Sequence, residues 1–213
     1  KLKYIRFWDE IFPNNKKWID DFCAEYLKHI NIPFEIWSHP KMVNGESINA
    51  LVDAGLSKVV IGIQSGSDRI RKDIFNRTET REEIIDACNT LHSCKVPNVV
   101  YDFMLKHPFE HEEDIQKTYE LCAELINPFK LQLHGLNFLP GTDIVEMAAE
   151  SGILDRGTLN KMMYGPMQEQ YDIYWGSKKK EVRSDFWYSL IYLTQFKFTK
   201  PLATRLAKLQ YKN

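Results

Sequence analysis

Two polar side chains interrupt apolar stretches of the sequence. Asp102 stands between Val-Val-Tyr and Phe-Met-Leu, and Gln64 ends the run Val-Val-Ile-Gly-Ile. A carboxylate or amide within a buried strand needs a hydrogen-bonding partner or a ligand, because burying it alone is costly. Asp102 therefore pairs inside the protein, with a neighbouring strand or Arg77, or binds a ligand. Gln64 either caps the end of a barrel or binds a hydroxyl group such as that of a sugar.

Further polar residues follow other predicted strands. Asp9 and Glu10 come after the first, Ser65 directly follows Gln64, and Asn137 follows the last. In parallel α/β folds the functional residues lie in the loops after the strands, which makes these residues candidates for one site. Taken alone, Asp9 and Glu10 indicate only a charged loop.

The histidines and cysteines predict no metal site. Three histidines near strand ends lack the geometry-defining spacing of metal ligands, and the four cysteines form no C-x-x-C pair. We expect the cysteines to be buried, reduced thiols, because free cysteine packs as a small apolar residue. The histidines are His39, His107 and His134, and the cysteines are Cys23, Cys88, Cys94 and Cys122.

The elements that must position these residues alternate regularly. Short β-branched and aromatic runs are each followed by a helical pattern, which predicts a parallel sheet with right-handed crossovers. An α/β barrel or open barrel fits best, and a doubly wound sheet is the structural alternative. Thr80 and Glu83 form a capping box that opens one helix. The predicted strands are 4–7, 34–37, 58–63, 98–105 and 130–136, and the predicted helices are 18–30, 48–52, 81–91, 115–125 and 143–152.

The pattern changes near residue 156. We predict an α/β unit over 1–155 and a helical C-terminal extension over 156–213, with helices at 185–196 and 201–211. The aromatic stripe on the first of these helices is interpreted as packing, and 178–180, a run of three lysines, as a solvated loop.

Composition gives no indication of a nucleic-acid or membrane-surface partner, because 28 Lys+Arg balance 29 Asp+Glu among 213 residues. No apolar run reaches the length of a membrane span and no signal peptide is evident, so we expect a cytoplasmic protein.

Four linked motifs together resemble radical S-adenosylmethionine enzymes. The run 62–67, Gly-Ile-Gln-Ser-Gly-Ser, is followed over 75–80 by Phe-Asn-Arg-x-x-Thr. Tyr-Asp-Phe-Met over 101–104, with a later Pro and Glu, and Leu-Pro-Gly-Thr over 139–142 resemble the later strands of that family. The resemblance covers roughly residues 4–153. It is strongest for branches that often carry a cobalamin-binding domain, with tRNA methylthiotransferases and oxygen-independent coproporphyrinogen dehydrogenases as relatives.

This resemblance implies a set of contacts to S-adenosylmethionine. Gln64 would bind the ribose hydroxyls, Asp102 would accept from one of them, and Arg77 would face the methionyl carboxylate. Asp9 and Glu10 stand where the family has a Gly-Gly-Glu-like motif for the methionyl ammonium, although the glycines are absent here.

Ser65 would assist these contacts, and the stretch at Leu136 and Asn137 would run near the adenine. At the fourth-strand loop, His107 replaces a glycine that many relatives have.

The resemblance also implies a 4Fe–4S cluster on three cysteines, but this sequence contains no C-x-x-x-C-x-x-C motif. We therefore expect a fragment carrying the second to sixth strands of a partial (βα) barrel, inactive alone and prone to self-association through its first strand.

The parent enzyme would generate a 5′-deoxyadenosyl radical, and a cobalamin-dependent variant would transfer a methyl group. Its expected partners are a small-molecule or unknown substrate and a reductant such as flavodoxin or ferredoxin. Two alternatives stay open. One is a non-radical α/β-barrel lyase or aldolase, for which Lys106 is the only, poor, candidate lysine. The other is a non-catalytic scaffold domain.

Overall fold

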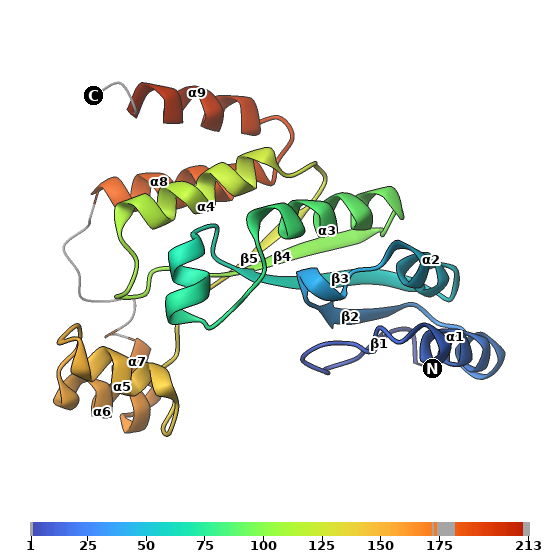
Figure 1. Ribbon diagram of the computed structural model, residues 1–213, viewed down its shortest axis with the longest axis horizontal. Helices are drawn as coiled ribbons and strands as arrows, with labels where there is room; N and C mark the ends of the chain where they lie inside the picture. Colours follow the sequence, from blue (N-terminus) through green and yellow to red (C-terminus); the bar gives the residue numbers. More distant parts are fainter. Residues whose placement is uncertain (1, 172, 174–181, 211–213) are drawn as a thin grey trace.

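Five parallel strands form an open sheet in the order of the chain (Figure 1). The computed structural model describes residues 2–171, 173 and 182–210. Within these residues the first strand pairs only with the second, as predicted for an edge strand. The fold is therefore α/β, with a parallel, open sheet as expected for a partial barrel. The strands are β1 (Ile5–Arg6), β2 (Phe34–Ser38), β3 (Leu56–Gln64), β4 (Asn98–Met104) and β5 (Lys130–His134).

A helix follows each of the first four strands. These helices and alternate strand residues share one hydrophobic core, which includes Val59, Ile61 and Ile63 of β3. Val60 and Val100 are buried but lie outside this core, because successive strand residues point to opposite faces. We call the face that carries Val60 and Val100 the inner face. The crossover helices are α1 (Lys16–His29), α2 (Gly45–Asp53), α3 (Arg81–Ser93) and α4 (Glu112–Glu124).

Two short helices interrupt the crossovers. The 3₁₀-helix η1 (Pro40–Met42) follows β2, and the π-helix η2 (Ile70–Ile74), which was not predicted, follows β3. The predicted capping box of α3 is confirmed: the Thr80 hydroxyl accepts from the Glu83 amide at 3.2 Å, and the Glu83 carboxylate accepts from the Thr80 amide at 2.8 Å. Such a pair satisfies two amides that the first helical turn leaves open.

Beyond β5 the chain forms a second small cluster of apolar side chains and then returns to the sheet. Leu136 and Phe138 pack there with Ile70 and Phe109, so β5 ends at His134 rather than at the predicted 136. Helices α6 (Arg156–Tyr164) and α7 (Met167–Tyr171) were not predicted. Helix α5 (Asp143–Glu150) shares the second cluster with α6, across the predicted boundary at 155.

Helix α8 (Val182–Thr194) lies along α4, and α9 (Lys200–Gln210) packs beside it (Figure 1). Trp187 is fully buried in the main core, as expected of a packing stripe, whereas Tyr192 and Phe196 are exposed. The predicted lysine loop at 178–180 and the end of the predicted helix at Tyr211 lie outside the described residues.

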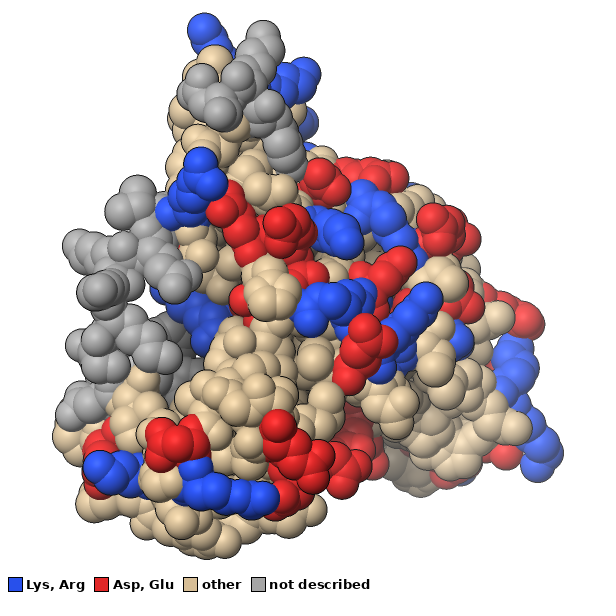
Figure 2. Space-filling model, turned by 60° about the vertical axis from the view of Figure 1, so that its left-hand side comes forward, with Lys and Arg blue, Asp and Glu red and all other residues tan. Residues whose placement is uncertain are grey.

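Cys23, Cys88 and Cys122 are buried free thiols, as predicted, and Cys94 is partly exposed. Among the described helices none is both long and apolar enough to cross a membrane. Figure 2 shows basic and acidic side chains interspersed over one face of the molecule, in agreement with the nearly balanced charge.

Candidate functional site

The candidate site lies at the carboxyl ends of β3 and β4, where the pairing of the two strands is irregular. Gly62 pairs with Asp102, but the register then shifts and Gln64 pairs with Phe103. Gln64 has φ of +67°, the left-handed region that favours glycine. A strained backbone of this kind costs about 1–3 kcal/mol and clusters at functional sites.

Two buried oxygen atoms at these strand ends have no hydrogen-bond partner among the described residues: Oε1 of Gln64 and Oδ1 of Asp102. The Nε2 atom of His134 on β5 lies 3.3 Å from this Asp102 oxygen without forming a hydrogen bond. Burial raises the pKa of the Asp102 carboxyl, against the charges of His134 and Arg77, which lower it. Buried acceptors without a partner are rare and indicate a place for a ligand.

Arg77 lies beside these acceptors. Its Nη2 donates to the Gly62 carbonyl at 2.6 Å, and its Nε donates to Oε1 of Glu79 at 2.5 Å. Gly62 is also the register partner of Asp102, so the fold brings Gln64, Arg77 and Asp102 to one edge of the sheet. The structure shows no hydrogen bond between Arg77 and Asp102 among the described residues. His134 of the neighbouring strand β5 lies within ion-pair distance of Asp102, so the alternative of pairing inside the protein stays open.

The structure turns Ser65 away from this edge. The Ser65 side chain is fully buried, its hydroxyl accepts from the Ser67 amide at 3.1 Å, and it lies 3.4 Å from the Thr118 hydroxyl of α4. Gly66 donates its amide to the same Thr118 hydroxyl at 2.9 Å. A ligand contact by the Ser65 hydroxyl, as predicted, would require this turn to leave α4.

The remaining predicted residues are not gathered around Gln64 and Asp102 by any side-chain contact. Asp9 and Glu10 are exposed after β1, two strands away from β3. The Leu136 side chain is buried in the second cluster, so only its backbone is available to a ligand. Asn137 is exposed next to it.

Sequence reasoning missed three polar residues near this edge. Glu79 is a fully buried carboxylate that binds Arg77, and Gln132 is the register partner of Asp102 on β5. His134, considered only as a metal ligand, lies next to Asp102 instead. Gln132 and His134 carry a usable signal, because they alternate along a strand on the face that carries Asp102. Glu79 stands in a polar loop, where neighbouring residues give no indication of burial.

The described residues contain no group of three His, Cys, Asp or Glu side chains able to hold a metal ion. Lys106, the residue considered for a lyase, has a side chain 42% exposed and ion-paired with Asp185 at 3.4 Å. It therefore lacks the buried, apolar environment in which a lyase holds its catalytic lysine.

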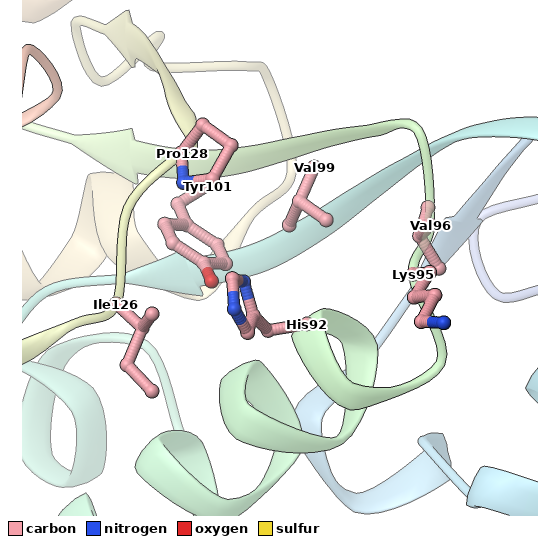
Figure 3. Close-up of a pocket in the computed structure, with 7 residues that line it drawn as sticks. All are labelled: His92, Lys95, Val96, Val99, Tyr101, Ile126 and Pro128. Carbon is pink, nitrogen blue, oxygen red and sulfur yellow. The ribbon is translucent and has the colours of Figure 1, made fainter.

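A separate cavity of about 230 Å³ opens near the opposite, amino-terminal end of β4 (Figure 3). It lies between the end of α3 and the segment before β5, and the Tyr101 hydroxyl points toward the His92 ring. Its position places it away from the unpartnered acceptors, which define the candidate site. The lining residues are His92, Lys95, Val96, Val99, Tyr101, Ile126 and Pro128.

Comparison with known proteins gives a family match over residues 12–122, more than half of the chain, to the radical SAM superfamily. Among curated relatives, tRNA-2-methylthio-N(6)-dimethylallyladenosine synthase of Ehrlichia chaffeensis is 44% identical over 69 residues, which are 32% of this chain and 15% of the relative. The chain thus spans a small part of the length of this relative.

Two solved structures share the fold. The archaeal Methanocaldococcus infernus Elp3 matches with a TM-score of 0.55 and 20% identity, over 70% of this chain and 40% of that one. The radical S-adenosylmethionine methyltransferase TsrM from Kitasatospora setae, solved with cobalamin and a [4Fe-4S] cluster, matches with a TM-score of 0.52 and 15% identity, over 68% and 31%.

Proposed function

We propose a function from one premise: the chain belongs to the radical SAM superfamily. Its carboxyl sheet edge would bind S-adenosylmethionine through Gln64, Asp102 and Arg77. The observation that carries this proposal is a pair of buried oxygens on adjacent strands, Oε1 of Gln64 and Oδ1 of Asp102, that accept no hydrogen bond from the described residues. A ribose diol offers two hydroxyl donors to such acceptors, so the residues present fit the nucleoside.

Arg77 supplies the opposite chemistry at the same edge. Nε and Nη2 of its guanidinium are held by Glu79 and Gly62, and the side chain is 19% exposed. A fixed, partly exposed guanidinium suits the carboxylate of the methionyl group, because its planar donors match two oxygens. Exposed Asp9 and Glu10 would complement the methionyl ammonium, and Asn137 with the backbone of Leu136 would lie near the adenine.

The cysteines of this chain do not fit a 4Fe–4S cluster. Those on helices lie on α1, α3 and α4, and Cys94 lies just after α3. We therefore propose that ligands outside this sequence hold the cluster, whose reduction of bound S-adenosylmethionine supplies the 5′-deoxyadenosyl radical. The residues described here bind and orient the nucleotide and exclude water from it.

Within the superfamily we favour the branch that uses cobalamin for methyl transfer. Two observations support this choice: the linked motifs resemble that branch, and the chain shares its fold with TsrM. The cobalamin would be held by another part of the complete protein. Its partners would be a small-molecule substrate and a reductant such as flavodoxin or ferredoxin.

Substitution Asp102→Ala in the complete, cluster-loaded protein tests the nucleotide site. It removes a charge-assisted hydrogen bond of about 1.5–3 kcal/mol, so we expect the Kd for S-adenosylmethionine to rise roughly ten- to hundred-fold. Equilibrium binding under anaerobic conditions measures it.

The matched control is Asn98→Ala, at the opposite end of the same strand, which should leave the Kd unchanged. Thermal unfolding of both variants checks that they are folded. An unchanged Kd in a folded Asp102→Ala protein would contradict the proposed site.

A further inference from the structure

A fully buried carboxylate joins two loops at the carboxyl edge of the sheet. The side chain of Glu79 has no exposed surface. Its Oε1 accepts from Nε of Arg77 at 2.5 Å, and its Oε2 lies 3.3 Å from Nε2 of His39, which follows β2. An isolated buried carboxylate is costly, so these two partners account for its place in the fold.

The backbone fixes the protonation of His39. Its Nδ1 accepts from the Lys41 amide at 3.1 Å, as the cap of η1, and therefore carries no proton. The proton of the neutral ring is then on Nε2, the atom that faces Glu79. Glu79 thus accepts a hydrogen bond from Arg77 with Oε1, while Nε2 of His39 lies within ion-pair distance of Oε2 without forming a hydrogen bond.

The charges around the three residues agree with this arrangement. Burial raises the pKa of Glu79, but hydrogen bonding and charge from Arg77, together with His39, outweigh it and lower the pKa. Burial and then the charge of Arg77 lower the pKa of His39, with a smaller contribution from Lys41, whereas Glu79 raises it. The arrangement at neutral pH is therefore an ionised Glu79, a charged Arg77 and a neutral His39.

We propose that Glu79, oriented by His39, is a positioning residue for Arg77. This inference rests on the proposed function, in which Arg77 binds the methionyl carboxylate. Glu79 fixes Nε and the Gly62 carbonyl fixes Nη2 at 2.6 Å, so two anchors determine the plane of the guanidinium. Nη1 has no hydrogen bond within the described part of the chain, so its two N–H groups and the second N–H of Nη2 are left as donors for the ligand.

Positioning of Arg77 would strengthen binding because it reduces the conformational entropy that the arginine side chain loses when the ligand binds. A free arginine side chain must give up its rotamer entropy when it binds a carboxylate, whereas a guanidinium already held in one plane does not. Partners that orient metal-binding side chains typically contribute a ten-fold or larger factor in affinity, and we expect an effect of the same order here.

Glu79→Gln in the complete, cluster-loaded protein tests the proposal, because it keeps the size of the side chain and removes the charge. We expect the Kd for S-adenosylmethionine to rise about ten-fold. Glu83→Gln is the matched control: this carboxylate is exposed in the same segment, and glutamine serves equally in a capping box. It should leave the Kd unchanged.

A thermodynamic cycle separates positioning from a general effect on the fold. If Glu79 acts through Arg77, the double variant Glu79→Gln/Arg77→Gln should bind no more weakly than Arg77→Gln alone. Additive losses would overturn the proposal, and so would an unchanged Kd in Glu79→Gln. If Arg77→Gln itself binds normally, the assignment of Arg77 in the proposed function is wrong, which is a different result.

The NMR signal of His39 gives a readout that needs no ligand. Glu79→Gln should lower the pKa of His39 further, because the carboxylate that raises it is gone, whereas Arg77→Gln should raise it. An unchanged pKa of His39 in the Glu79→Gln protein would overturn the proposed contact between these two residues.

If Glu79→Gln does not fold, His39→Asn replaces it in the same cycle. Asparagine keeps an acceptor for the Lys41 amide but loses the donor to Glu79, so we expect a smaller rise in Kd, about two- to five-fold. An unchanged Kd in the folded His39→Asn protein would then overturn the role of His39 and Glu79 in positioning.

Discussion

At the scale of single residues, the carboxyl ends of β3 and β4 depart from ordinary packing rules. Gln64 adopts a left-handed backbone, and one side-chain oxygen each of Gln64 and Asp102 is buried without a hydrogen bond from the described residues. Departures of this kind reduce stability, and natural proteins keep them mainly where function requires them. Because the strained backbone and both buried oxygens occur at the ends of adjacent strands, this edge is the part of the inner face that we assign to ligand binding.

Gly66 beside this edge has no room for a side chain. A Cβ atom there would lie 2.4 Å from Cα of Thr118 and 2.5 Å from the Lys117 carbonyl, both backbone atoms of α4. We expect Gly66→Ala to lower the free energy of unfolding by roughly 3 kcal/mol, since the turn must leave the helix. Chemical denaturation measures it.

Gly45→Ala is the control, because a Cβ at that helical position meets only ordinary contacts, the nearest at 3.5 Å. It should be neutral or slightly stabilising. Equal stability of the two variants would show that α4 does not pack against the Ser65–Ser67 turn as described.

At the scale of elements, the turn between β4 and α4 holds two buried titratable groups. Burial lowers the pKa of His107 to about 4, and neither ring nitrogen forms a hydrogen bond within the part of the chain that the structure describes. Burial raises the pKa of Glu110 to about 7, although its carboxylate accepts from the Tyr188 hydroxyl of α8 at 2.8 Å and from the Lys106 amide at 2.8 Å. The turn therefore connects α8 to the sheet through a carboxyl that titrates near neutrality.

These two groups affect stability in opposite directions. Between about pH 4.5 and 7 the folded state holds the Glu110 proton more tightly than the unfolded state does, so its contribution to stability falls as pH rises. Between about pH 4 and 6.5 the unfolded state protonates His107 more readily, so that contribution rises with pH. The two trends offset each other in the wild-type protein.

Substitution of either residue should expose the pH dependence of stability that the other residue contributes. In Glu110→Gln only the His107 trend is left, so we expect its free energy of unfolding to rise by roughly 1–3 kcal/mol as the pH increases from 4.5 to 6.5. In His107→Leu only the Glu110 trend is left, so its free energy of unfolding should fall by a similar amount over the same pH range. Urea denaturation at several pH values measures both profiles. Parallel pH profiles in the two variants would contradict the opposite shifts.

At the scale of the whole molecule, β1 leaves one edge of the sheet open among the described residues. The Ile5 amide donates to the carbonyl of the residue before β2, and the Phe7 amide donates to a carbonyl of β2, each at 3.1 Å. Trp8, just after the strand, is 72% exposed. Open strand edges with adjoining apolar surface recruit other chains.

We therefore expect the isolated 213-residue chain to self-associate in a concentration-dependent way. Light scattering after size exclusion measures the mass. Trp8→Lys should shift the population toward monomer, whereas Leu139→Lys, at an exposed apolar position remote in sequence, should not. A strictly monomeric wild-type chain at high concentration would contradict this expectation.

The alternation of the five strands with α1 to α5, the parallel sheet and the capping box could be predicted from residue patterns, because hydrophobic period and capping residues act locally. The same holds for selecting Gln64 and Asp102, since a polar residue in an apolar strand is visible without a structure. The edge position of β1 was implied by the family resemblance alone. Only the tertiary structure decided that Ser65 faces α4, that Glu79 holds Arg77, and that the chain after β5 builds a second cluster. Each of these depends on which surface packs against a loop, and the partners are remote in sequence: the Gly66 amide meets a hydroxyl 52 positions away, and the loop after β2 supplies the histidine that faces Glu79.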